Sequence, residues 1–178
     1  LPTIFEKFKN TKGIVIDIRN YPSEFVVFSL GRYLVSTKTE FVKFTQGVLS
    51  YPGLFQWTPT LSIGDDNPEY YRGKVAILVN EMTLSQAEYT TMAFRSTRNA
   101  IVIGSTTAAA DGNVSRIYLP GNVSTFISGI GVYYPDGAET QRVGIIPNIE
   151  VNSTIKGIKE GRDEVLEKAI EVIQSQKM

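Results

Sequence analysis

Residues 74–79 read KVAILV, a run of apolar and β-branched side chains that decides the fold class of this 178-residue chain. Strands that are buried on both faces of a parallel sheet have this composition. Two further runs share it, GIVIDI at residues 13–18 and AIVI at residues 100–103. The sequence therefore predicts at least three buried strands.

Segments long enough for helices separate these strands. Residues 24–35 are apolar on most sides, and residues 84–95 place their apolar side chains along one helical face. The chain also opens on a helix-like stretch. Strands that alternate with helices favour an α/β fold, in which crossover helices cover a mostly parallel sheet.

The remaining segments differ from this pattern. Residues 114–119, 123–127 and 130–134 are short strand candidates, with a Pro-Gly turn after the first and a Pro-Asp-Gly turn after the last, which predicts an antiparallel portion near the C-terminus. A final helix is expected from about Arg162, with its apolar face docked on the sheet. Residues 46–71 are expected to form a long loop.

Composition narrows the classes of function. The chain has 18 Lys and Arg against 18 Asp and Glu, and no dense basic run, so a nucleic acid is not expected as the partner. It has no Cys and no His, which removes disulfides, the usual zinc ligands and any Ser-His pair within the chain. We expect no cofactor, no metal and no membrane-spanning segment. Because the chain begins at Leu1 without a signal peptide, residues 1–178 are interpreted as one domain of a longer protein.

Ser85 is the candidate nucleophile. It lies where the strand 74–79 gives way to the helix 84–95. A turn of this kind exposes a hydroxyl above the sheet edge, and free amides at the start of the helix stabilise a developing oxyanion.

A capping role competes with this interpretation. Ser85 and Glu88 have the spacing of a capping box, and most serines in such positions only cap the helix. Thr83 and Gln86 have the same spacing, so Thr83 is a second candidate cap that would leave Ser85 free.

Three segments in order resemble the carboxyl-terminal-processing (tail-specific) serine protease family, peptidase family S41. Residues 17–24, DIRNYPSE, resemble its D-L-R-x-N-P-G-G segment, with Ser-Glu in place of Gly-Gly. Residues 73–80 and then LSQAE at 84–88 resemble its G-K-strand-N and S-A-S-E nucleophile segment. Residues 137–151 are similar to its closing G-x-x-I-x-G-x-G-I-x-P-D-I-x-V stretch.

The resemblance implies a fold and a reaction. The fold would be the spiral α/β core of ClpP-like and crotonase-like proteins. Ser85 would attack a peptide carbonyl to form an acyl-enzyme. The backbone amides of Gln86 and Ser23 would form the oxyanion hole, although Ser23 equally fits an ordinary strand-to-helix turn.

At the position of the general base, the sequence departs from the family pattern. At the position of the family's catalytic lysine this chain has Ala110, which cannot accept a proton. The chain looks closer to the branch with the tricorn core and the retinoid-binding-protein repeats, in which a histidine from a preceding region acts with an acidic residue. Such a base would precede Leu1, and the assisting polar residue would be Glu139 or, by position, Gln141.

The resemblance further implies a polypeptide substrate, an upstream PDZ-like or cap domain, and a location in the periplasm, cell envelope or outside the cell. Two other functions stay open: a non-catalytic module that binds a peptide or an apolar ligand, and a crotonase-type enzyme acting on acyl-CoA.

The triplet Asp111-Gly112-Asn113 is predicted to be a turn beside the site. Asp65-Asp66-Asn67 is predicted to be a turn and not a calcium loop.

Overall fold

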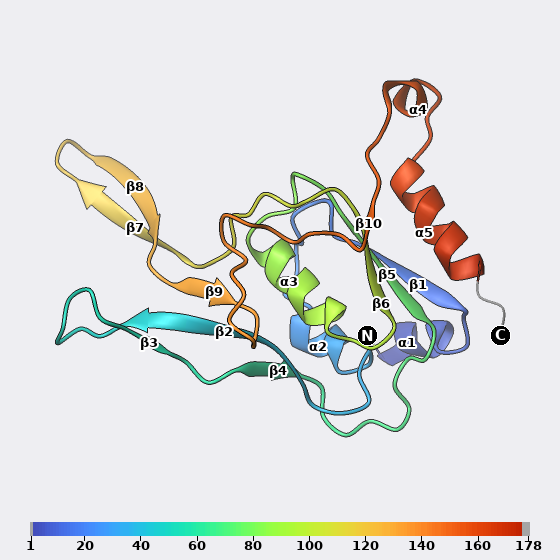
Figure 1. Ribbon diagram of the computed structural model, residues 1–178, viewed down its shortest axis with the longest axis horizontal. Helices are drawn as coiled ribbons and strands as arrows, with labels where there is room; N and C mark the ends of the chain where they lie inside the picture. The colour runs from blue at the N-terminus through green and yellow to red at the C-terminus, as the bar shows by residue number, and fades with distance from the viewer. Residues whose placement is uncertain (1, 176–178) are drawn as a thin grey trace.

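A parallel sheet forms the centre of the computed structural model, which describes residues 2–175. Its strands are β1 (Gly13–Asp17), β5 (Lys74–Val79), β6 (Ala100–Gly104) and β10 (Ile149–Glu150), in the order β1-β5-β6-β10 (Figure 1). All three pairings are parallel. The three predicted strands and the α/β class are confirmed, and the short β10 adds a fourth.

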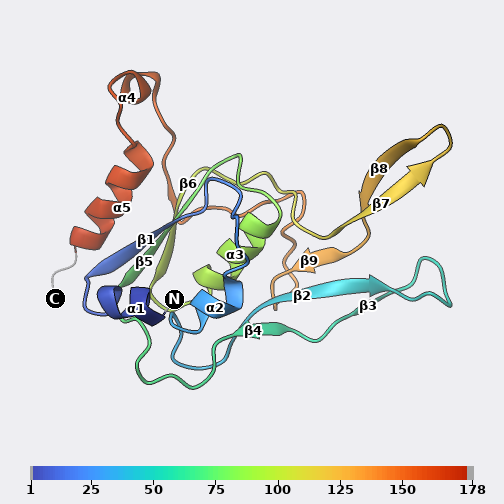
Figure 2. The same cartoon turned by 180° about the vertical axis from the view of Figure 1, so that it is seen from behind.

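Helices cover both faces of this sheet. On one face lie α2 (Val27–Gly31) and α3 (Gln86–Arg95), and on the other lies α5 (Glu164–Gln174) (Figures 1 and 2). Strand β5 serves both layers because its side chains alternate: Val75, Ile77 and Val79 join the core with α3, whereas Ala76 and Leu78 pack with α5. The predicted final helix and its docking on the sheet are confirmed. The short helices α1 (Pro2–Phe8) and α4 (Ile155–Lys159) complete the set.

The helix expected over residues 24–35 is shorter than predicted. Only α2 is helical, and the chain then tightens into a turn in which the amides of Tyr33 and Leu34 bond to the carbonyls of Leu30 and Gly31. Leu34 and Val35 are nevertheless buried. The apolar character of the segment therefore reflects burial of the loop after the helix rather than a longer helix.

A second, antiparallel sheet includes two short strands from the expected loop 46–71. It consists of β2 (Thr39–Gly47), β3 (Phe55–Trp57), β4 (Leu61–Ile63) and β9 (Gly131–Tyr133), with β2 pairing each of the other three. The expected loop is interrupted by β3 and β4, which have three residues each and pair with β2, whereas most of residues 48–71 lie outside strands and helices, as predicted.

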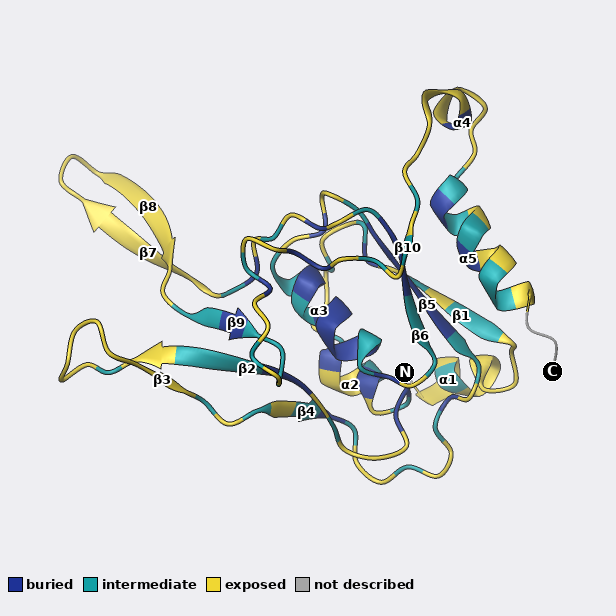
Figure 3. Ribbon diagram, in the orientation of Figure 1, coloured by how far each residue is buried: buried dark blue, intermediate teal, exposed yellow. Residues whose placement is uncertain are grey.

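A hairpin projects from the body of the molecule. Its strands, β7 (Val114–Leu119) and β8 (Val123–Ser128), pair only with each other, and every residue in both is exposed (Figure 3). The predicted antiparallel portion near the C-terminus is thus confirmed. Within residues 2–175, no helix is long and apolar enough to cross a membrane.

An ion-pair network ties the end of β1 to α5. The Arg19 guanidinium bonds to both oxygens of Asp17 and, at 2.8 and 2.7 Å, to both oxygens of Asp163, which caps α5 by accepting from the Leu166 amide. Arg19 holds the pKa of Asp163 below its usual value, and it lowers that of Asp17 against the opposing effect of burial. The network orients the chain that leaves the sheet at Ile18.

Candidate active site

The carboxyl ends of β1, β5 and β6 meet at one edge of the sheet, where open α/β folds bind ligands. Thr83, in the turn after β5, joins them: its hydroxyl donates to the Ile18 carbonyl (3.0 Å), and its own carbonyl accepts from the Ala108 amide (2.9 Å). Thr83 is fully buried in this role. It therefore does not cap α3, so the second of the two capping interpretations was wrong.

Ser85 has a backbone conformation that side chains avoid. Its φ of 53° and ψ of −121° fall in a region favoured only by glycine. Such a conformation costs on the order of 1–3 kcal/mol and persists only where its surroundings impose it, as at functional sites. The observation agrees with a nucleophile held on a sharp strand-to-helix turn.

The buried carboxylate of Glu88 imposes this turn. Glu88 lies in the first turn of α3 with none of its surface exposed. It accepts hydrogen bonds from the amides of Ser85 (3.2 Å), Ala109 (3.0 Å) and Ala110 (2.9 Å), and from the Thr107 hydroxyl. One side chain thus joins the turn after β5 to the loop after β6.

Ser85 both caps α3 and lines a cavity. It is the N-cap residue of α3 and forms a capping box with Glu88, in which the Ser85 side chain faces the Glu88 amide and the Glu88 carboxylate accepts from the Ser85 amide. The first capping interpretation is therefore confirmed, although the side-chain contact is looser than a normal cap hydrogen bond. Ser85 also lines a cavity of about 640 Å³. The other lining residues are Tyr21, Phe25, Phe44, Gln86, Tyr89, Asp111, Gly112, Asn113, Val114 and Ser115.

Aromatic rings form one wall of this cavity. Tyr89 stacks on Phe25 (6.0 Å between ring centroids) and on Phe44 (6.2 Å). Burial, together with the nearby Asp111 carboxyl, raises the pKa of Tyr89 to about 12, so the phenol stays neutral. This wall offers apolar contact to a side chain of a bound molecule.

Of the two expected oxyanion donors, Gln86 lines the Ser85 cavity and Ser23 does not. Gln86 begins α3 and lines the cavity, and within the described residues its amide has no backbone acceptor, which leaves it available to a ligand. The Gln86 side chain donates to the Glu24 carbonyl (3.3 Å). Ser23 lies between two lining residues, Tyr21 and Phe25, but does not line the cavity itself.

Ala110, Glu139 and Gln141 line a neighbouring cavity of about 730 Å³ and not that of Ser85. Glu139 pairs with Arg142 at 2.9 Å. Gln141 is structural, because its amide nitrogen donates to the carbonyls of Asp111 (2.8 Å) and Ile130 (3.0 Å).

Asp111 is a residue of this site whose chemistry the sequence did not reveal. Asp111 lines both cavities, and only 6% of its surface is exposed. Burial, reinforced by the nearby Glu88 carboxylate, raises its pKa to about 7. The sequence predicted only a turn beside the site, from the Asp-Gly pair that is typical of turns.

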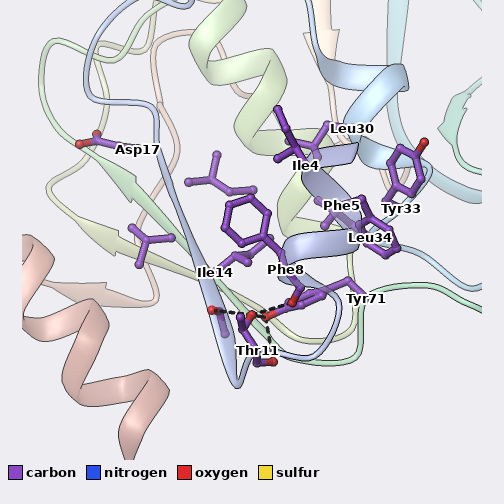
Figure 4. Close-up of a pocket in the computed structure, with 13 residues that line it drawn as sticks. Ile4, Phe5, Phe8, Thr11, Ile14, Asp17, Leu30, Tyr33, Leu34 and Tyr71 are labelled. Carbon is purple, nitrogen blue, oxygen red and sulfur yellow. Dashed lines mark hydrogen bonds between the residues drawn. The ribbon is translucent and has the colours of Figure 1, made fainter. Parts of the chain in front are cut away.

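A separate apolar cavity of about 510 Å³ lies between α1, β1 and α2. Phe5, Phe8, Ile14 and Tyr33 contribute to its lining, with Thr11 at one end and Asp17 at the other (Figure 4). Thr11 and Tyr71 share a hydrogen bond of 2.8 Å there. The cavity carries none of the residues that surround Ser85.

Comparisons with solved structures support the fold. The chain is similar to a candidate peptidase from Parabacteroides merdae (TM-score 0.86, 20% identity, 98% of this chain and 56% of that one). It is also similar to the photosystem II D1 C-terminal processing protease (TM-score 0.62, 19% identity, 84% and 37%). The tricorn protease matches as well (TM-score 0.62, 16% identity, 91% and 15%).

These similarities confirm the predicted α/β fold of the ClpP/crotonase-like type, with its parallel sheet and antiparallel portion. The chain spans 56% or less of each of the three proteins. No curated protein matches the sequence. A family model, however, matches residues 1–151, which is most of the chain. The chain belongs to peptidase family S41, a family of serine peptidases.

Proposed function

We propose that this chain is the core of a serine-type peptidase, an endopeptidase or a C-terminal processing enzyme, in which Ser85 forms the acyl-enzyme. The observation that carries the proposal is the conformation of Ser85, with φ at 53°, beside a cavity that it lines. A strained nucleophile at a strand-to-helix turn suits acyl transfer. The free Gln86 amide, at the positive end of α3, supports an oxyanion there.

The finer points of the proposal follow the family resemblance. Ala110 stands at the lysine position, which favours the branch of the tricorn core. A base would then come from a region upstream of Leu1, with a PDZ-like or cap domain in the longer protein. The substrate would be a polypeptide. The protein would act on it in the periplasm, in the cell envelope or outside the cell.

Labelling with a fluorophosphonate tests the proposal without knowledge of the substrate. We expect the probe to phosphonylate wild-type full-length protein at Ser85, and S85A to take up no label, because only an activated serine displaces fluoride from the probe. Mass spectrometry of the labelled peptide identifies the residue. Labelling at another serine, or none in the wild type, would reject Ser85 as the nucleophile.

Stability of two Ser85 variants tests the strain independently. We expect S85G to be more stable than S85A by about 1 kcal/mol, because glycine relieves strain of roughly 1–3 kcal/mol while losing somewhat more entropy on folding. Urea denaturation followed by tryptophan fluorescence measures the difference. If S85A proved the more stable, the positive φ would not be imposed on residue 85.

A non-catalytic binding module is the second candidate function. The apolar cavity between α1, β1 and α2, at about 510 Å³, favours this alternative because it is large enough for an apolar ligand (Figure 4). The two candidates separate in the labelling experiment. A non-catalytic module would never react at Ser85. It would bind an apolar fluorescent probe, and F8A would lose that binding.

A further inference from the structure

We propose that two hairpins that project from the body of this protein dock on a lipid surface, with the side chains at their tips in the membrane interface. One is the hairpin β7–β8, and the other consists of β2, β3 and the loop between them (Figures 1 and 2). Both extend toward the same end of the longest axis of the molecule, so a flat surface would meet both tips. The tips, residues 48–54 and 118–123, include no residue of the Ser85 cavity, so docking is separate from the proposed peptidase function.

Both hairpin tips lie in stretches of sequence without charge. Residues 44–64 and 117–135 contain no Asp, Glu, Lys or Arg, although such residues make up 20% of the chain. The tips expose large apolar side chains instead, on both hairpins (Figure 3). These are Leu49, Tyr51 and Leu54 on the first hairpin, and Tyr118, Leu119 and Val123 on the second. Exposed apolar side chains that gather in this way mark an interaction surface.

On the first hairpin, the side chains change in character from the tip toward the body. The loop at the tip carries Leu49 and Leu54, and Leu49 exposes all of its surface. The rings of Phe55 and Trp57 follow on β3 and are exposed as well. Behind them lies the cation of Lys43, whose Nζ is 4.6 Å from the centroid of the Trp57 ring. The order is therefore aliphatic, aromatic and cationic.

The second hairpin repeats this order with a different set of residues. Leu119 and Val123 form the last pair of the ladder at the tip, next to the exposed ring of Tyr118. Phe126 follows on β8, opposite Arg116, and the guanidinium carbon of Arg116 lies 4.7 Å from the centroid of the Phe126 ring. Arg116 is the one charged residue between positions 114 and 128. A cation again lies behind an aromatic ring and an aliphatic tip.

A membrane interface has its layers in the same order. Aliphatic side chains favour the boundary of the acyl chains, Trp and Tyr rings collect at the level of the headgroups, and Lys and Arg side chains reach the phosphates. Arg116 and Leu119 are three residues apart on β7, or roughly 10 Å, which is about the depth to which interfacial segments are buried. A protein partner would have to fit the shape of each hairpin. A layered surface, in contrast, selects the same order of side chains on both.

The backbone of the first tip suits a less polar medium. In its loop the Val48 amide donates to the Leu54 carbonyl (2.9 Å), the Tyr51 amide to the Val48 carbonyl (3.0 Å), and the Leu54 amide to the Tyr51 carbonyl (3.0 Å). Backbone groups without partners are costly away from water. These bonds pair three amides within the loop itself, while Leu49 stays exposed on its outside.

Flotation with lipid vesicles tests the proposal on full-length protein. We expect the wild type to float with phosphatidylcholine vesicles. The bound fraction should change little between about 0.1 and about 0.5 M NaCl, because the contact is apolar and salt screens only interactions between charges. The chain has a formal net charge of +0, so electrostatic attraction to the vesicles is not what drives this binding.

Two double variants remove the apolar tips one at a time. We expect L49S/Y51S and L119S/V123S each to lower the partition coefficient by about 10-fold or more, because two apolar side chains no longer leave water on binding. I155S/I158S changes an exposed aliphatic pair on α4, away from both hairpins, and is the matched control that should bind like the wild type (Figure 1). S85A should also bind like the wild type. Circular dichroism checks that each variant is folded.

Trp57 gives a second readout that does not depend on flotation. It is the only tryptophan of this chain and lies in the aromatic layer of the first hairpin. Its fluorescence should shift to shorter wavelength when phosphatidylcholine vesicles are added, and W57F should lack this shift. An unchanged spectrum on addition of vesicles would show that the ring stays in water and would overturn docking through this hairpin.

Three results of the flotation experiment would overturn the proposal. The first is wild-type protein that does not float, or tip variants that float as well as the wild type. The second is binding only to vesicles that contain phosphatidylglycerol, lost at high salt, which would show adsorption by charge alone. The third is a wild-type dimer without vesicle binding that L119S/V123S converts to a monomer, which would assign the tips to a second copy of the protein. Labelling of Ser85 is independent of all three, so the proposed function is tested separately.

Discussion

Replacing Glu88 with alanine is expected to lower the free energy of unfolding by about 3–5 kcal/mol, the largest loss among the polar side chains of the site. The reason is the number of groups that depend on one carboxylate. Three amides and the Thr107 hydroxyl donate to it in an environment without solvent. Each donor left unpaired in a buried place costs roughly 1–3 kcal/mol unless water enters.

Two variants sharpen this prediction. E88Q keeps the shape but turns an NH₂ group toward amide donors, so we expect it to lose more than half as much stability as E88A. E81A removes an exposed glutamate that makes one hydrogen bond, to Ser105, and should change stability by less than about 0.5 kcal/mol. Urea denaturation measures all three. A loss in E88A no larger than in E81A would contradict the role assigned to Glu88.

Replacing Gly104 with alanine is expected to cost about 4 kcal/mol or more, or to prevent folding. Gly104 ends β6 beside the end of β5, with φ at 137°. A Cβ at this position would lie 1.8 Å from the Val79 carbonyl oxygen and 2.9 Å from its carbon. These are backbone atoms of a central strand, so neither can move without breaking the ladder. Steric overlap and backbone strain therefore add.

Two other glycines separate these causes. Gly53 also has positive φ, at 88°, but a Cβ there would meet nothing within 4 Å, so G53A should show the strain alone, about 1 kcal/mol. Gly129 has neither feature, and G129A should be neutral or slightly stabilising. Thermal melting followed by circular dichroism ranks the series. If G104A melted like G53A, the close approach of β5 and β6 at their ends would be disproved.

The parallel sheet could be predicted from sequence because its signal is local. Runs such as VAILV, residues 75–79 of β5, are apolar at every position, and that property does not depend on knowing the neighbouring strand. The second sheet gave no comparable signal. Strand β3 consists of three exposed residues, and what makes it a strand is pairing with β2. Such pairing is a property of the fold, not of the segment.

The residues of the candidate site also differ in whether the sequence alone could predict their roles. Ser85 could be found because a strand, a turn and a helix meet in adjacent residues and because the surrounding motif resembles a family. Asp111 could be identified only as part of a turn. Its burial and its proximity to Glu88 come from chain segments that are distant in sequence. The capping competition between Thr83 and Ser85 likewise depended on the Ile18 carbonyl, 65 residues away.

The backbone at Ser85 has a consequence for the history of such proteins. A lineage that no longer needs the hydroxyl would gain stability by exchanging serine for glycine, whereas alanine would keep the cost and lose the reaction. Drift after loss of the reaction should therefore favour glycine at this position. A homologue with glycine at the start of α3 would then descend from an ancestor with serine there. In that ancestor, selection for the reaction had kept the serine although its backbone conformation favours glycine.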